Sequence, residues 1–124
     1  DHPAASADAV ELARLADAPW ATGYAVMGWE QMVQRTCREL GGFEPDIRHR
    51  VNDVTIAVAL VAGGLAVTML PELVRADRVP GVVLRPFAER PAHRQIIAVT
   101  RETDAARPST QALLTAIHAA ADGL

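Results

Sequence analysis

The sequence predicts an α/β fold, in which helices flank a mixed sheet. One segment reads as a helix followed by a strand, and helical and strand patterns alternate along most of the chain. The segment is DVTIAVALVAGGLAVTMLP at residues 53–71, with an almost wholly apolar helix at 54–62 and an apolar, partly β-branched strand at 65–70. A helix that leads into a buried strand is half of a βαβ unit, which places the chain in the α/β class.

The ends of this central segment carry the residues that helix and strand boundaries favour. Asp53 is a typical N-cap residue, and its carboxylate can accept the free N–H groups of the first turn. Gly63 and Gly64 end the helix, because glycine adopts a left-handed backbone at little cost. Pro71 lacks an N–H and ends the strand. Since residues 54–62 are apolar all round, we expect this helix to be covered on nearly every side.

The first third of the chain predicts a loop, a short helix, a strand and a longer helix. Residues 12–17 form the short helix, which ends before Pro19 because the residue preceding a proline disfavours helical backbone. Residues 20–24 are short and rich in β-forming side chains. The longer helix spans about 29–40, and helical spacing relates its apolar face of Trp29, Met32, Val33, Thr36, Cys37 and Leu40.

The remaining elements follow from alternation and turn residues. Residues 47–51 alternate Ile, His and Val with two arginines, which indicates a strand with one wet face. A short helix begins at Glu72, and VPGV at 79–82 suits a type II turn. Strands are expected at 82–85 and 95–101. Pro108 begins a last helix, whose apolar face contains Leu113, Ile117 and Ala120.

Composition bounds the class of protein. A chain of 124 residues is one domain's length, and we expect a single domain over 1–124. The net charge is −3 and the twelve basic residues, all arginine, are scattered, so no basic face for nucleic acid is predicted. The single cysteine excludes an internal disulfide and fits a reducing cytoplasm. No apolar run is long enough to span a bilayer, and no signal peptide opens the sequence.

Catalytic, metal and cofactor sites are not predicted. Cys37 falls on the apolar face of a helix, where a buried structural thiol is the favoured interpretation over a reactive one. His49 alternates with arginines on a strand, which favours a packed histidine over a base. The other histidines are isolated from one another and have no metal-ligand spacing, and nucleotide-binding glycine patterns are absent. We therefore expect no enzymatic activity, no metal and no cofactor.

Two loops, each between a strand end and a helix start, are the candidate binding site. Ligands of open α/β sheets bind outside the carboxyl ends of the strands, where helix N-termini offer N–H groups to a carboxylate or another small anion. The alternative is that both loops are ordinary, with Asp53 as a capping residue whose charge would repel an anion. We expect the anion near Gly28 or Thr55. The predicted site residues are Thr22, Gly23, Tyr24, Gly28, Asn52, Val54 and Thr55.

An ordered set of short motifs resembles the effector-binding domain of LysR-type transcriptional regulators. The family's glycine-rich pattern near the end of its second subdomain is similar to LVAGGLAVTMLP at 60–71, where Ala66 replaces the usual second glycine. Other similar stretches are HPA at 2–4, LARLADAPW at 12–20, GFEP at 42–45, RPF at 85–87 and IAVTR at 97–101. Each motif alone is weak, but the order and spacing match across nearly the whole chain.

The resemblance implies a type II periplasmic-binding-protein-like fold with two subdomains and a ligand cleft between them. This chain then corresponds to the second subdomain, with the helix at 108–122 belonging to the first, and is a fragment of a longer regulator. In that family a small metabolite binds in the cleft and alters how a tetramer holds DNA. The resemblance places the two candidate loops in that cleft and implies DNA contact only through an N-terminal winged helix-turn-helix.

Two other functions compete with effector sensing. A solute-binding domain of transport type shares the fold but is secreted, and a small α/β enzyme would use Cys37 or a histidine.

The last expectation concerns oligomers: an open apolar edge at 95–101 and the apolar face of the last helix predict self-association, most simply as a twofold dimer.

Overall fold

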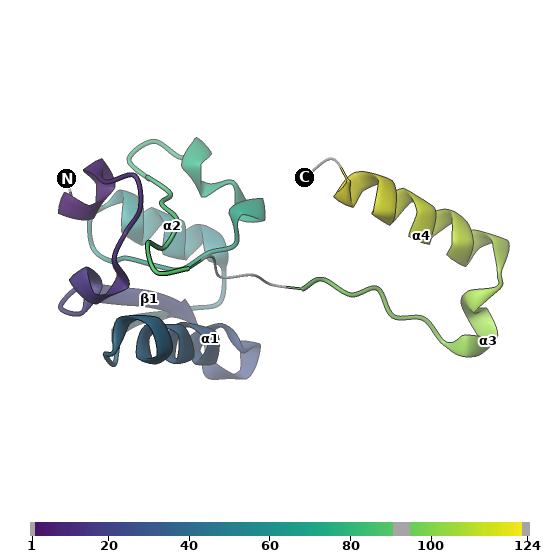
Figure 1. The fold of residues 1–124 in the computed structure, drawn as a ribbon, viewed down its shortest axis with the longest axis horizontal. Helices are drawn as coiled ribbons and strands as arrows, with labels where there is room; N and C mark the ends of the chain where they lie inside the picture. The colour runs from purple at the N-terminus through teal and green to yellow at the C-terminus, as the bar shows by residue number, and fades with distance from the viewer. Residues whose placement is uncertain (1, 91–94, 123–124) are drawn as a thin grey trace. The chain divides into compact units, whose positions relative to one another are not determined.

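The computed structural model describes residues 2–90 and 95–122 of a chain that divides into two compact units, 1–93 and 94–124. The first unit holds both strands and two α-helices, and the second holds two further helices (Figure 1). The helices and strands are β1 (Pro19–Gly23), α1 (Trp29–Thr36), β2 (Asp46–Val51), α2 (Val54–Ala62), α3 (Glu102–Ala105) and α4 (Pro108–Ala121). Short 3₁₀ turns connect them: η1 (Pro3–Ser6), η2 (Leu12–Leu15), η3 (Ala25–Met27), η5 (Glu72–Val74) and η6 (Ala76–Arg78).

The sheet of the first unit is a parallel pair, β1 beside β2. Its register aligns Pro19 with Asp46 and Gly23 with Val51, with one shift between Trp20 and Ala21. Both strands lie where the sequence predicted strands, and the side chains of β2 alternate between exposed and covered up to the buried Val51. Because the strands are parallel, their carboxyl ends lie at the same edge of the sheet.

The other edge of β1 pairs with a single residue of the segment after α2. The N–H of Ala21 donates to the carbonyl of Val67 at 2.9 Å, and the N–H of Val67 donates to the carbonyl of Pro19 at 2.8 Å. The predicted strand at 65–70 is therefore reduced to one bridge at Val67. This leaves β1 as the central strand, hydrogen-bonded on both sides.

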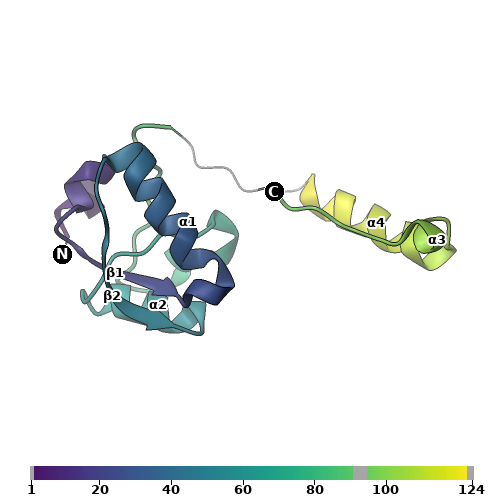
Figure 2. The ribbon, with the colours of Figure 1, turned by 90° about the horizontal axis from the view of Figure 1, so that it is seen from below.

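The helices α1 and α2 lie on opposite faces of the pair, so the first unit has three layers (Figures 1 and 2). On the α1 side the core contains the buried side chains of Val10, Leu12, Leu15, Trp20, Val33, Cys37 and Met69. On the α2 side a smaller cluster contains Ala21, Val51, Ala57 and Ala66. Burying both faces of β1 accounts for its apolar, non-alternating sequence.

The bounds of α2 are those that the sequence predicted. Asp53 caps its first turn, and the left-handed Gly64, with φ of 70°, ends it. The N–H of Leu65 donates to the carbonyl of Leu60, and that of Gly64 donates to Val61, both at 2.9 Å, which is the Schellman arrangement. The expected cover on every side is wrong. Only two of its side chains are buried, and Ile56 is 46% exposed.

The predicted helix at 29–40 is present, but its last turn is wider than an α-helix. After α1 the backbone continues as a π-helical turn, η4 (Cys37–Gly41), and the left-handed Gly42 ends it with φ of 71°. The predicted type II turn is also confirmed, because the N–H of Val82 donates to Val79 at 3.1 Å and Gly81 has φ of 84°. Positive φ at the third residue of that turn requires glycine.

The N-terminal segment of the first unit is tied to residues 85–89. The N–H of Val10 donates to the carbonyl of Pro86, and Ala88 donates back to Val10, both at 2.9 Å. The guanidinium of Arg85 donates to the carbonyls of Ala5 and Ala7, and the N–H of Leu12 donates to a carboxylate oxygen of Glu89. These contacts fix a segment that is otherwise only two short 3₁₀ turns.

Replacing Arg85 by alanine is expected to loosen residues 2–9 while the sheet stays folded. The change removes the hydrogen bonds that Arg85 donates to two main-chain carbonyls. Their loss should lower the stability of this segment by about 1 kcal/mol, because the contacts are exposed. Limited proteolysis should cut the segment faster than in the parent chain. Arg14→Ala is the matched control, since Arg14 pairs only with the neighbouring Glu11. Equal cleavage rates for the two variants would contradict this role of Arg85.

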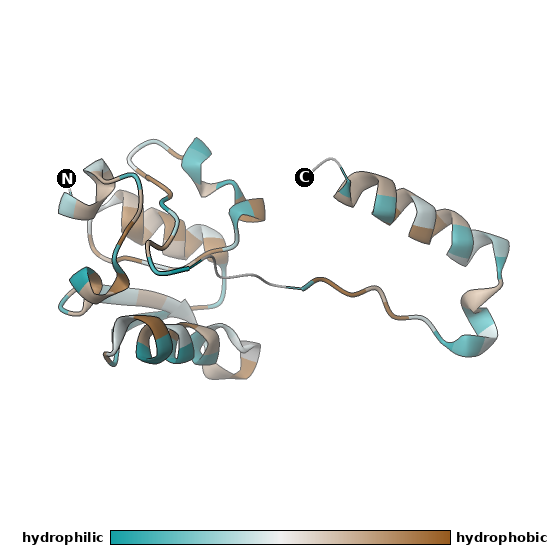
Figure 3. Cartoon of the chain, viewed as in Figure 1, coloured by the Kyte–Doolittle hydropathy of each residue, from teal (hydrophilic) through white to brown (hydrophobic). Residues whose placement is uncertain are grey.

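Two predicted strands, 82–85 and 95–101, are wrong. Neither segment makes a strand in the described residues, and the only pairing nearby is the bridge between Val10 and Phe87. Figure 3 shows the hydrophobic character of the stretch before α3. The side chains of Ile96, Ile97 and Val99 are 66%, 67% and 89% exposed. A strand needs a partner to complete its hydrogen bonds, whatever its own β-propensity.

The last helix begins at Pro108, as the sequence predicted, and runs to Ala121. Its expected apolar face is exposed in the described part of the chain, including Leu113 and Ile117. No helix in the described ranges combines the length and the apolarity that crossing a bilayer requires.

Candidate functional site

The two candidate loops lie side by side at the carboxyl edge of the sheet. Gly23 at the end of β1 is in register with Val51 at the end of β2, so both loops leave the sheet at the same point. Of the predicted site residues, Thr22 and Gly23 are buried in the strand end and Val54 is half-buried. The others are exposed: Tyr24, Gly28, Asn52 and Thr55.

Gly23 is required by the close packing of the first loop on α1. A Cβ at this position would lie 2.8 Å from Cε3 of Trp29 and 3.3 Å from its Cβ, atoms that cannot move without displacing the whole ring. The indole N–H of Trp29 donates to the carbonyl of Met69 at 3.0 Å, which fixes the ring in place. The start of α1 is therefore held against the strand end.

The start of α1 has no side-chain cap. Its N-cap residue is Gly28, which has φ of 73° and no side chain to accept a hydrogen bond. The N–H of Gly28 itself donates to the carbonyl of Ala25 at 3.1 Å. The backbone N–H groups in the first turn of α1 therefore donate no hydrogen bond to a capping side chain.

The start of α2 is capped from within. An oxygen of Asp53 accepts from the N–H of Thr55 at 2.7 Å and from its hydroxyl at 2.6 Å. These hydrogen bonds hold the pKa of the Asp53 carboxyl below its usual value. The N–H of Thr55, one of the two expected anion contacts, is therefore already used, and the negative charge of Asp53 stands beside it.

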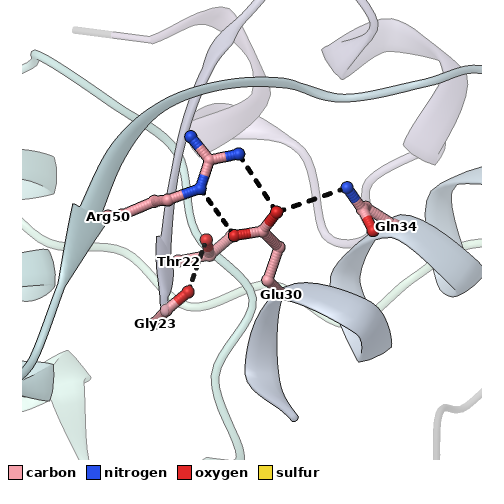
Figure 4. A network of polar contacts seen from close by, with 5 residues as sticks. All are labelled: Thr22, Gly23, Glu30, Gln34 and Arg50. Carbon is pink, nitrogen blue, oxygen red and sulfur yellow. Dashed lines mark hydrogen bonds and ion pairs between the residues drawn. The ribbon is translucent and has the colours of Figure 1, made fainter. Parts of the chain in front are cut away.

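A buried carboxylate that the sequence did not single out lies at the same edge. Glu30, the second residue of α1, accepts from Nε of Arg50 at 2.7 Å and from its Nη2 at 3.0 Å (Figure 4). The amide of Gln34 lies 3.5 Å from Glu30 on the other side. The hydrogen bonds from Arg50 lower the pKa of Glu30, and the carboxylate in turn raises the pKa of Arg50.

This Glu30–Arg50 pair links α1, which follows the first loop, to β2, which precedes the second loop. Arg50 is the last but one residue of β2 and is in register with Thr22, while Glu30 follows the first loop directly. The carboxylate is buried, whereas the side chain of Arg50 is 45% exposed. The sequence carries one signal of this contact, an acidic residue in the first turn of a helix, but not its partner.

Two hollows of the described surface lie beside the loops. An apolar cavity of about 40 Å³ lies under residues 82–84, and a shallow hollow of about 400 Å³ runs along the exposed side of α1. Among the predicted site residues, only Gly28 lines either of them. The loops by themselves present an edge with exposed polar groups.

Cys37 is a structural thiol. It is fully buried in the core at the π-helical turn, and burial, together with the charge of Glu44, raises the pKa of its thiol to about 12. Thiolate, the reactive form, is then scarce at neutral pH. His49 is half-buried on β2, and His93 lies outside the described residues. No cluster of three potential metal ligands forms within residues 2–90 and 95–122.

The folded chain is expected to resist thiol reagents. With a pKa near 12 and no exposed surface, Cys37 should react only when the fold opens. A chromogenic disulfide reagent should label it within minutes in concentrated urea and far more slowly in buffer at pH 7. Complete labelling of the folded chain within minutes would show that the thiol is accessible.

Comparison with known proteins gives a consistent assignment. The family model of the LysR substrate binding domain matches residues 1–122. The HTH-type transcriptional regulator XapR of Escherichia coli is 29% identical over 116 residues, which are 93% of this chain and 39% of that protein. The uncharacterized HTH-type transcriptional regulator YcgK of Bacillus subtilis is 37% identical over 65 residues, which are 52% of this chain and 20% of that protein.

The chain spans about two fifths of the length of XapR and a fifth of that of YcgK in these matches. The family match covers both compact units, including α4. It confirms the resemblance that the short motifs indicated. The chain therefore belongs to the LysR substrate binding domain family, whose fold is the α/β fold of type II periplasmic binding proteins.

Proposed function

We propose that this chain senses a small-molecule effector as the regulatory domain of a LysR-type transcriptional regulator. The observation that carries the proposal is the meeting of two loops at the carboxyl edge of β1 and β2, within a domain of this family. Ligands of open α/β sheets bind at such an edge. Both relatives bear the name of helix-turn-helix transcriptional regulators, which supports regulation over transport.

The proposed site uses the loop residues that the sequence indicated. Backbone and side-chain groups of the first loop, at Thr22, Gly23, Tyr24 and Gly28, would face the ligand from one strand end. Asn52, Val54 and Thr55 would face it from the other. The register of the two strands and the exposure of Tyr24, Gly28, Asn52 and Thr55 support this grouping. A carboxylate would meet the uncapped start of α1 rather than the capped start of α2.

The proposal extends to the partners of the whole regulator. DNA would be bound by a winged helix-turn-helix outside these 124 residues, and the regulator would act in the cytoplasm. The chain itself would bind the effector without turning it over. The burial of Cys37 argues against thiol chemistry, which is one of the two options, beside a histidine, for the alternative of a small enzyme.

A ligand screen with loop variants tests the site. Thermal shifts would be recorded for the 124-residue chain with a panel of small carboxylates, amines and neutral polar metabolites. For any compound that stabilises the chain, Asn52→Ala should weaken binding roughly tenfold, the value of one lost hydrogen bond. Thr115→Val, which removes a hydroxyl bonded within α4, is the control outside the loops. Equal affinity of Asn52→Ala and the parent would contradict the site.

The second unit supports the expectation that the chain self-associates. Ile96, Ile97, Val99, Leu113 and Ile117 are all exposed, and apolar surface of this extent commonly becomes an interface. We expect a dimer whose mass by light scattering depends on protein concentration. Leu113→Glu together with Ile117→Glu should shift it to monomer. A monomeric mass at every concentration, with amides of α4 protected from hydrogen exchange, would contradict this.

A further inference from the structure

We propose that Arg50 is the cationic group that recognises an anionic effector at the carboxyl edge of the sheet, and that Glu30 is the residue that positions it. The inference rests on the proposed function, because it assigns charge recognition within that same site. It adds a residue that lies in neither predicted loop. At this edge, some hydrogen-bond donors are already bonded within the protein, and others remain able to bind an anion.

The two helix starts differ in what they can offer an anion. At α2, the N–H of Thr55 donates to Asp53, whose own negative charge would repel a second carboxylate. At α1, no side chain caps the first turn, and the acidic residue of that turn, Glu30, has both carboxylate oxygens bonded to Arg50. An anion at this edge would therefore sit on the α1 side, which is where Arg50 reaches from β2.

Arg50 is placed and fixed for such a contact. Nε and Nη2 are held by the two oxygens of Glu30, at 2.7 and 3.0 Å, in a geometry that only a planar guanidinium provides. Within the described residues, Nη1 makes no hydrogen bond, and the side chain is 45% exposed. Figure 4 shows the guanidinium above Thr22, with its third nitrogen directed away from Glu30.

The burial of Glu30 explains why the ion pair fixes the orientation of the Arg50 guanidinium. Holding a carboxylate at 7% exposure costs free energy that an exposed residue would avoid, and the ion pair recovers it only while Arg50 stays in place. The other arginine of β2, Arg48, pairs with the exposed Asp46 two residues away and gains no such restraint. The guanidinium of Arg50 is thus held in one orientation by a buried partner, whereas that of Arg48 is paired only with an exposed residue of its own strand.

Glu30 also reduces the positive charge that an anion would meet. The pair is neutral as a whole, so removing the Glu30 charge while keeping an oxygen acceptor would leave a net charge of +1 at the site. Glu30→Gln and Arg50→Gln should therefore change anion binding in opposite directions. A pair that served folding alone would give the same direction for both variants.

The test uses sodium acetate and inorganic phosphate as probes, at constant ionic strength, with the 124-residue chain labelled with ¹⁵N. Acetate should shift the Nε–H signal of Arg50 and the amide signals of residues 28–31. Arg50→Gln should weaken binding roughly tenfold, as expected for a lost charge-assisted contact. Glu30→Gln should strengthen it several-fold, and Arg48→Gln should leave it unchanged. The acetate affinity of Arg50→Lys, which keeps the charge, should lie between those of the parent and Arg50→Gln. This second variant keeps the test valid if Arg50→Gln fails to fold.

Equal acetate binding by Arg50→Gln and the parent would overturn the proposal. So would weaker binding by Glu30→Gln, because the pair would then be purely structural. A neutral compound that binds the two loops equally in the parent and in Arg50→Gln would overturn the role of Arg50 while leaving effector sensing intact. Shifts at Arg50 with acetate, but no metabolite binding at the loops, would instead argue against the proposed function.

Discussion

Trp20→Ala is expected to lower the free energy of unfolding by about 3–5 kcal/mol, the range for removing a buried aromatic side chain. Trp20 is 1% exposed and lies on β1, which is hydrogen-bonded on both edges. Its indole N–H donates to the carbonyl of Leu15 at 3.3 Å, and its ring lies 6.3 Å from that of Phe43, centroid to centroid. The change would leave a cavity between the sheet and α1, while the carbonyl of Leu15 would keep its hydrogen bond from the N–H of Ala18.

Urea unfolding followed by circular dichroism measures this loss. Val26→Ala is the control, since Val26 is 93% exposed and its truncation should change stability by less than about 0.5 kcal/mol. Trp20→Phe should fall between the two, because it keeps a ring and loses the N–H donor. A loss below about 1 kcal/mol for Trp20→Ala would mean that β1 is not the centre of the core.

Gly23→Ala is expected to lower the free energy of unfolding by about 1–3 kcal/mol, although it adds only one methyl group. The new Cβ would lie 2.8 Å from Cε3 of Trp29, so the indole must move and give up its hydrogen bond to Met69. Since Trp29 is the first residue of α1, the start of that helix should move with it. The same substitution should therefore weaken ligand binding at the first loop.

Gly63→Ala provides the matched control for this substitution. Gly63 has helical φ of −77°, and an added Cβ would meet its nearest neighbour at 3.4 Å, an ordinary contact. Its stability should equal or slightly exceed that of the parent, because alanine restricts the unfolded chain. Urea titration and the emission of the tryptophans report both effects. Unchanged stability and emission for Gly23→Ala would contradict the tight packing of Trp29 on the strand end.

The helices could be predicted from the sequence because their signals are local. The cap at Asp53, the two glycines after residue 62 and the proline at 108 each act within a few residues, and α2 and α4 begin where those residues predict. The π-helical turn after α1 carries no such signal. Cys37 at the start of this turn and Phe43 just after it both pack in the core against distant parts of the chain, which the local sequence does not reveal.

The strands could be predicted only in part, because a strand depends on a partner. β1 and β2 have each other, and both were predicted. Residues 65–70 have similar β-propensity but form one bridge, at Val67, and residues 95–101 form none in the described chain. The exposure of Ile56 on α2 has the same origin. The apolar sequence of a helix shows that its surface favours burial, but it does not show which part of the chain would bury it.

The candidate site was partly predictable for a geometrical reason. Loops after two strands of an α/β sheet meet whenever those strands are parallel neighbours, and the register of Gly23 with Val51 brings these two together. The Glu30–Arg50 pair was not predictable, because its members are twenty residues apart and belong to different element types. Nothing in either local sequence indicates the other.

The most direct test of effector sensing is a map of backbone amide shifts for a compound that stabilises the chain. In ¹H–¹⁵N spectra recorded across a titration, we expect the largest shifts to fall together on residues 22–29 and 52–55, with a single dissociation constant for both loops. Shifts confined to the cavity beneath residues 82–84, or to residues 95–122, with both loops unchanged, would contradict the site and the function proposed for it.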